Sequence, residues 1–153
     1  MQPMPITEHT LVSELVQAPP ETCFAVATDL ASYPAWVPAI TSVEVLRADE
    51  LGRPIEAAFQ AEAMGRRSSY VLAYDYEDAP HSFRWQQVRG DLTRRLNGAY
   101  TFETSDADSG ATNVVYELDI ELAVPLPGFV KRRAETKILS AALNQFRARA
   151  ESV

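Results

Sequence analysis

The chain has 153 residues, of which 46% are hydrophobic and 23% charged, so it has the size of one domain and is too apolar to be a disordered segment. Its 21 acidic and 14 basic residues give a formal charge of −7, and no nucleic-acid partner is expected because the phosphate backbone would be repelled. The single cysteine, the N-terminus without signal-peptide features and the lack of a membrane-length apolar run predict a cytoplasmic protein with no internal disulfide.

The first forty residues predict a strand followed by two short helices. Residues Glu8–Val16 are expected to form the opening strand. A helix is predicted over Glu21–Leu30, where apolar residues recur at helical spacing behind a proline pair suited to a first turn. A second short turn or helix is predicted over Ser32–Ile40, although Pro34 and Pro38 interrupt it.

From residue 41 onward the hydrophobic pattern changes to the alternation that is typical of strands, with turn-rich separators. The predicted strands are Thr41–Arg47, Pro54–Met64, Arg66–Glu77, Ser82–Val88, Leu92–Thr104 and Thr112–Val124. Their short connections, including a hairpin turn across residues 105–110, favour antiparallel neighbours.

The longest helical pattern runs from Phe129 to about Glu151, and its length of about 35 Å is enough to cross a small sheet. Two neighbouring stripes are candidates for its buried side: Val130, Ala134, Ile138, Ala141, Ala142 and Gln145, and beside them Leu139, Leu143, Phe146 and Ala150. The predicted fold class is therefore α+β. We expect a seven-stranded, curved antiparallel sheet wrapped around a long C-terminal helix, with two short helices after the first strand.

Strand parity predicts which face of the sheet this helix covers. The heavier, aromatic-rich face comprises Tyr70, Leu72, Tyr74, Tyr76, Phe83, Trp85, Leu96, Gly98, Tyr100, Phe102, Val114, Tyr116, Leu118 and Ile120. The opposite set is polar and suits solvent, with room for arginine–carboxylate pairs across strands. Aromatic residues that face alanines on the helix predict an internal cavity of roughly 300–1,000 Å³; the alternative is that the rings fill this space.

Several segments resemble a known family. They are YPAWVPAITSVEVL at 33–46, FRWQQVRGD at 83–91, LNGAYTFET at 96–104, TNVVYELDIEL at 112–122 and PLPGFVKRRAE at 125–135. With the order of elements, they make the chain from about Glu8 to Glu151 similar to the START-like helix-grip (SRPBCC) superfamily, and most similar to its polyketide cyclase/dehydrase and coenzyme Q-binding branch.

The resemblance implies an apolar ligand tunnel between the sheet and the last helix, with an entrance near the short helices and strand loops. Members of the superfamily bind lipids, isoprenoid quinones, steroids or polycyclic polyketides, and some catalyse cyclisation or dehydration of the last group. The fold therefore does not by itself settle the function.

The predicted ligand-binding residues come from the aromatic face, the short helices and the last helix. They are Trp36, Phe59, Tyr70, Tyr74, Trp85, Tyr100, Tyr116, Ile138 and Ala142. The resemblance places Trp36 over the tunnel mouth, where it is either a lid residue or plain core. No catalytic residue is predicted, because the enzymes of the family share no short signature that matches positions here.

The other reactive side chains are expected to be inert or solvated. His9 and His81 have no metal-ligand spacing around them, and we expect them at the surface, with no metal site and no cofactor. Cys23 lies on an apolar helix face without a neighbouring base, which predicts a buried, unreactive thiol. An acidic patch near a turn is expected to be solvated: Asp75, Glu77 and Asp78.

A basic cluster, Lys131-Arg132-Arg133, opposes the dipole at the start of the last helix. These side chains either pair with surface carboxylates or make a transient contact with an anionic membrane surface or an acidic carrier protein. Leu126 and Phe129 would lie beside such a contact.

The residues and the resemblance together predict binding of a small hydrophobic molecule, such as a lipid, isoprenoid or polyketide, in the internal cavity of a monomer or homodimer, for transport or sequestration. The alternative is a polyketide aromatase/cyclase or dehydratase that acts in the same cavity. A third alternative is a protein partner or regulator whose pocket is vestigial.

Overall fold

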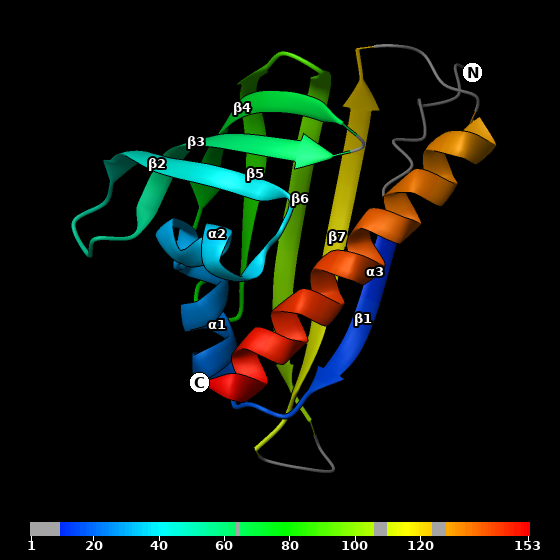
Figure 1. The fold of residues 1–153 in the computed structure, drawn as a ribbon. Coiled ribbons are helices and arrows are strands. Elements are labelled where there is room, and N and C mark those ends of the chain that lie inside the picture. Colours follow the sequence, from blue (N-terminus) through cyan, green and yellow to red (C-terminus); the bar gives the residue numbers. More distant parts are fainter. Residues whose placement is uncertain (1–9, 64, 106–109, 124–127) are drawn as a thin grey trace, which may run out of the picture.

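A computed structural model describes residues 10–63, 65–105, 110–123 and 128–153 of the chain. Within these ranges the side chains of residues 63, 128–132, 134 and 135 are not described. The element order is one strand, three short helical segments, six strands and one long helix, as Figure 1 shows.

The strands are β1 (Thr10–Val16), β2 (Ile40–Ala48), β3 (Pro54–Ala63), β4 (Arg66–Asp75), β5 (Ser82–Gly90), β6 (Thr93–Thr104) and β7 (Thr112–Leu122). The helical segments are α1 (Pro20–Thr28), the 3-10 turn η1 (Leu30–Ser32), α2 (Tyr33–Trp36) and α3 (Gly128–Ser152).

All seven strands form one sheet in the order β1-β7-β6-β5-β4-β3-β2, and each pair of neighbours is antiparallel. Strands β2 to β7 are therefore a meander, which β1 extends by pairing with β7. The sheet curves, and α3 crosses its concave side, in contact with β1 and β7 and with the short helices α1 and α2 (Figure 1). This arrangement confirms the predicted helix-grip class.

The second short helix is shorter than predicted. It ends at Trp36 instead of continuing toward Ile40, because Val37 precedes Pro38 and takes an extended conformation with φ −111° and ψ 98°. The chain then enters β2 at Ile40. The first helix likewise ends at Thr28, two residues before its predicted end.

The face that α3 turns toward the sheet differs from one of the two predicted stripes. Leu139, Leu143, Phe146 and Ala150 are fully buried, whereas Ile138 is 49% exposed. The larger leucine and phenylalanine side chains remove more apolar surface from water than the alanine-rich stripe would, which explains the choice of face. The stripe members Val130 and Ala134 lie outside the described side chains.

The parity of the strands is as predicted. The buried side chains on the concave face include Leu72, Tyr76, Phe83, Trp85, Tyr100, Phe102, Val114, Leu118 and Ile120. On the opposite face Arg95 binds two carboxylates of the neighbouring strand, with Nε 2.7 Å from Asp119 Oδ2 and Nη1 2.7 Å from Glu121 Oε2.

The structure shows whether most of the reactive side chains are exposed or buried. His81 is exposed, and so are the patch residues Asp75, Glu77 and Asp78, whereas His9 lies outside the described residues. Cys23 is fully buried, and burial raises the pKa of its thiol. No helix in the described part of the chain combines the length and apolar character that a membrane span requires.

Candidate functional site

Aromatic rings cover the concave face of the sheet, and Trp85 of β5 lies at their centre. Its ring centroid is 6.0 Å from that of Tyr74 on β4, 5.8 Å from that of Tyr100 on β6 and 5.8 Å from that of Tyr116 on β7. Tyr100 and Tyr116 are closer still, at 4.6 Å. Neighbouring strands thus bring the four rings together; we call these four residues the aromatic cluster.

The indole of Trp85 lies over Gly98, its ladder partner on β6. A Cβ atom built at residue 98 would lie 2.3 Å from Trp85 Cζ2 and 2.7 Å from the backbone oxygen of Glu117. A glycine at this position therefore leaves the volume that the indole occupies. The backbone ladder between β5 and β6 ends at this pair, and beyond it Gln87 N–H donates to the side-chain oxygen of Asn97 at 3.0 Å.

Rings from the helices close one side of the cluster. Phe146 of α3 has its centroid 5.4 Å from Tyr100, and Trp36 of α2 contacts Phe146 at 6.1 Å and Tyr33 at 5.1 Å. Near the C-terminal half of α3 the space between helix and sheet is therefore filled by side chains, as the alternative to a cavity supposed.

Tyr74 and Tyr116 are less enclosed than this packing suggests. Both project from strands that have neighbours on each side, and both contact buried rings, yet both stay partly exposed to solvent. Tyr70 of β4 and Leu96 of β6, on the same face, are also partly buried and not fully so. These four side chains therefore remain partly accessible from solvent.

The tyrosine hydroxyls fall into two groups. Tyr33 donates to the backbone oxygen of Ala27, and Tyr76 donates to that of Pro54 at 2.6 Å. Within the described part of the chain the other four tyrosine hydroxyls have no hydrogen-bond partner. They belong to Tyr70, Tyr74, Tyr100 and Tyr116.

Burial raises the pKa of all four unpartnered tyrosines. It raises the pKa of Tyr70 to about 12 and shifts the pKa of Tyr100 well above the usual range of a phenol. Burial, followed by repulsion from neighbouring tyrosines, does the same to the pKa of Tyr74 and Tyr116. The four hydroxyls are therefore neutral at physiological pH, and each keeps a proton to donate.

Three other predicted site residues differ from one another in burial. Phe59 is buried and stacks on Tyr70 with a centroid distance of 5.3 Å, beside the aromatic cluster. Ala142 is half-buried. Ile138 is 49% exposed, whereas the adjacent Leu139 is buried.

Trp36 lies between the interior and an outer hollow. A hollow of about 470 Å³ is lined by α1, by Trp36 and by the end of α3, including the charged residues Glu21, Asp29 and Arg149. The same indole contacts Phe146 on its inner side. Trp36 therefore separates this hollow from the rings on the concave face, which fits either predicted role, lid or core.

Several aromatic residues that lie beside the site were not among the predicted ligand-binding residues. Phe146 belongs to the second of the two stripes noted on the last helix, and Phe83 and Phe102 share the strand parity of the cluster. Their periodicity was a sufficient signal. Tyr33 carries no such signal, because its ring is positioned by the turn between η1 and α2.

A family model described as polyketide cyclase / dehydrase and lipid transport matches residues 16–147, which include every element except most of β1 and the last turn of α3. The chain belongs to this family. No curated protein matches it in sequence.

Solved structures share the fold of this chain. A START superfamily protein from Mycobacterium smegmatis has a TM-score of 0.88 and 22% identity, covering 94% of this chain and 97% of that one. TTHA0849 from Thermus thermophilus has a TM-score of 0.74 and 23% identity, covering 95% of each. The Zhui aromatase/cyclase from Streptomyces sp. R1128 has a TM-score of 0.71 and 17% identity, covering 94% and 93%.

Proposed function

We propose that the protein binds a small, neutral hydrophobic molecule that carries hydrogen-bond-accepting oxygens, in the space between the sheet and α3. The observation that carries this proposal is the set of unpartnered hydroxyls on Tyr70, Tyr74, Tyr100 and Tyr116. Tyr100 is 5% exposed, and a buried hydroxyl without a partner costs free energy, so such groups are rare unless a ligand or water satisfies them. Tyr70, Tyr74 and Tyr116 are partly exposed, so their hydroxyls can donate to a molecule that enters from solvent.

The chemistry of the cluster defines the class of ligand. Flat aromatic walls stabilise an apolar, ring-containing molecule by area and by ring contacts. Among the described residues no buried side chain is charged, so none could balance an ionised ligand in the core, where an unpaired charge is costly. Hydroxyls whose pKa is raised remain donors, so they recognise carbonyl, ether or phenol oxygens.

These observations support binding more than catalysis. A cyclase or dehydratase needs groups that move protons near physiological pH. Among the described residues no carboxylate, histidine or lysine is buried, and the raised pKa of the cluster's tyrosines makes them poor acids. The family description and the aromatase/cyclase neighbour support an apolar site for a polyketide-like molecule.

Two probes of matched shape test the proposal: anthracene, which has no acceptor, and 9,10-anthraquinone, which has two. We expect the purified protein to bind anthraquinone more tightly, measured by quenching of tryptophan fluorescence. Tyr74→Phe and Tyr100→Phe should each weaken anthraquinone binding by about threefold to tenfold, the worth of one hydrogen bond, and leave anthracene binding unchanged.

Tyr76→Phe is the matched control, because its hydroxyl already donates to the backbone oxygen of Pro54. This variant should keep the wild-type preference for anthraquinone. Equal affinity of the wild-type protein for the two probes, or a native mass spectrum and quenching experiment that show no binding of either, would contradict the proposal.

A further inference from the structure

The cationic side chains of this acidic protein fall into two groups, one ion-paired and one unpaired. The paired ones include Arg53 with Asp49, Arg95 with Asp119 and Arg147 with Glu14. Within the described part of the chain a second group of exposed cations has no ion pair: Arg66, Arg67, Arg89, Arg94, Arg133 and Lys137. We call these six residues the basic end.

Contacts between turns place the first four of these cations together. Arg66 and Arg67 begin β4, and Arg89 and Arg94 flank the turn between β5 and β6. Asp91 in that turn joins the two sites, since its carboxylate accepts hydrogen bonds from the hydroxyl and amide groups of residues 68 and 69 at 3.0 to 3.2 Å. All four cations therefore lie at one end of the sheet.

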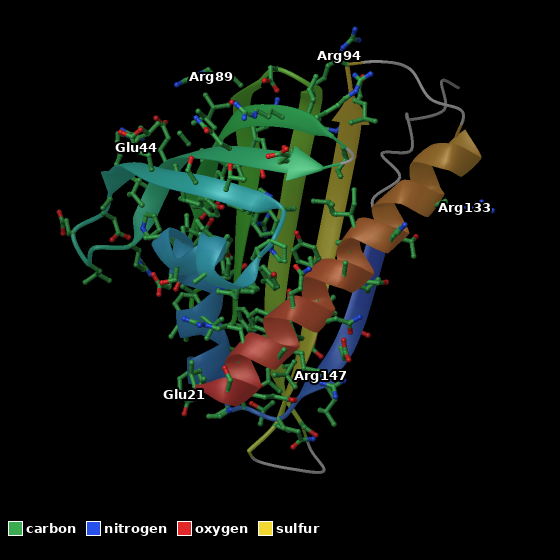
Figure 2. The ribbon with its side chains drawn as sticks, in the orientation of Figure 1. Glu21, Glu44, Arg89, Arg94, Arg133 and Arg147 are labelled. Atoms are coloured by element: carbon green, nitrogen blue, oxygen red, sulfur yellow. The ribbon has the colours of Figure 1, made fainter. Side chains whose placement is uncertain are left out.

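The start of α3 adds Arg133 to this end, and Lys137 follows one turn later on the same face of the helix. Ala123 N–H donates to the backbone oxygen of Leu92 at 2.9 Å, so β7 ends beside the same turn, and α3 begins five residues later. Figure 2 shows Arg89, Arg94 and Arg133 in the upper half of the molecule, whereas Arg147 and Glu21 lie at the opposite end.

Four described carboxylates lie near these cations. The hydrogen bonds from Ser69 lower the pKa of Asp91 and keep it ionised, and Glu121 binds Arg95. Glu62 lies opposite Arg67 in the ladder without an ion pair, and Glu44 lines a hollow of about 420 Å³ together with Arg89. Among the described side chains the six cations outnumber these four carboxylates, although the whole chain has a net charge of −7.

Exposed apolar side chains lie among the cations. Val88, next to Arg89, is 50% exposed, and Ile138, next to Lys137, is 49% exposed. Leu122 at the end of β7 is 37% exposed. Cations interspersed with exposed apolar residues fit a surface that combines negative charge with an apolar layer beneath it, which describes an anionic lipid bilayer better than an acidic protein.

We propose that the basic end docks the protein on an anionic membrane surface. The cations are attracted to the lipid headgroups, Val88 and Ile138 contact the headgroup boundary, and the acidic remainder of the molecule is repelled, so that one orientation is favoured. The proposal concerns the outside of the molecule and does not depend on what the interior binds.

Vesicle co-sedimentation tests this proposal. We expect the full chain to bind vesicles of an equal mixture of phosphatidylcholine and phosphatidylglycerol at low ionic strength, to release them as salt screens the charges, and not to bind vesicles of phosphatidylcholine alone. Arg89→Gln with Arg133→Gln should lower the partition coefficient by about fivefold for each arginine.

Matched controls separate this site from the total charge. Arg47→Gln with Arg84→Gln removes two exposed arginines elsewhere, with side chains 66% exposed, and should leave binding nearly unchanged. Ile138→Ser should weaken binding, whereas Leu51→Ser, at a position 77% exposed between β2 and β3, should not.

Two outcomes would overturn the proposal. One is that the protein does not associate with the anionic vesicles at low ionic strength. This holds also if the basic end binds an acidic soluble protein instead. The other is an equal loss of binding in the Arg89/Arg133 and Arg47/Arg84 pairs. Since anthraquinone binding is measured without vesicles, failure of one proposal is distinguishable from failure of the other.

Discussion

The hydroxyl partners of individual tyrosines separate structural from candidate binding residues in the same sheet. Tyr76 and Tyr100 are both buried on the concave face, at 9% and 5% exposure. The Tyr76 hydroxyl donates to Pro54, which ties the residue after β4 to the start of β3, whereas the Tyr100 hydroxyl has no partner in the described structure. The two residues should therefore respond differently to the same substitution.

We predict that Tyr76→Phe lowers the free energy of unfolding by about 1 kcal/mol, because the backbone oxygen of Pro54 loses its donor. Tyr100→Phe should change it by less than about 0.5 kcal/mol or increase it, because a buried hydroxyl without a partner is removed. Urea unfolding of the ligand-free protein measures both values. A larger loss for Tyr100→Phe would show that its hydroxyl has a partner within the protein.

The sequence was informative about which side chains share a face and uninformative about their polar partners. Strand parity was enough to group Tyr74, Trp85, Tyr100 and Tyr116 on the concave face, since a side-chain period of two leaves no other choice. The bond from Tyr76 to Pro54 joins residues 22 positions apart and depends on strand register. Periodicity does not encode such a bond.

At the scale of elements, α3 is fixed to the sheet by one apolar stripe and by ion pairs at its C-terminal half. Leu139, Leu143 and Phe146 are buried against the concave face. Arg147 binds Glu14 of β1, and it also approaches Glu151 at 3.4 Å. The stripe sets the rotation of the helix and hence which rings face the aromatic cluster.

This rotation predicts different costs for two neighbouring truncations. Leu143→Ala should lower the free energy of unfolding by about 2–5 kcal/mol, because a fully buried side chain leaves a cavity. Ile138→Ala should cost less than about 1 kcal/mol, since half of its surface is already in water. Thermal or urea unfolding measures both. Equal costs would mean that the helix presents the alanine-rich stripe to the sheet.

The choice between the two stripes could not be made from the helix alone. Both stripes are apolar and adjacent, and the rotation of a helix depends on the shape of the sheet it covers. The strands were more predictable, since each begins and ends within about two residues of its expected bounds where these are described. Helix α2 ends early, at Trp36, because of Pro38, and the position of this proline in the sequence indicates such an end.

For the whole molecule, the tyrosines of the concave face should lower the stability of the fold at alkaline pH. Their pKa in the folded protein lies above the value near 10 expected in the unfolded chain, and that of Tyr70 reaches about 12. Below pH 10 both states are protonated and the stability is intact. Between about pH 10 and 12 the unfolded state releases protons that the folded state keeps, so stability falls as pH rises.

We predict that the free energy of unfolding declines above about pH 10, by about 1.4 kcal/mol per pH unit for each tyrosine that stays protonated in the fold. Urea unfolding across this range, with phenolate absorbance as the second signal, measures the decline. The phenolate signal of these residues should appear together with unfolding. Ionisation of all six tyrosines near pH 10 in the folded protein, with unchanged stability, would contradict this prediction. Tyr100→Phe should make the decline shallower.

The pairing of β1 with β7 has a consequence for how the protein is made. Val16 lies opposite Thr112, and Gln17 N–H donates to Glu151, 134 positions later in the chain. Strand β1 must therefore wait, without its neighbour, until β7 has been translated about 100 residues later. Closing so long a loop is entropically costly and slow, so this edge of the sheet should be the last to assemble.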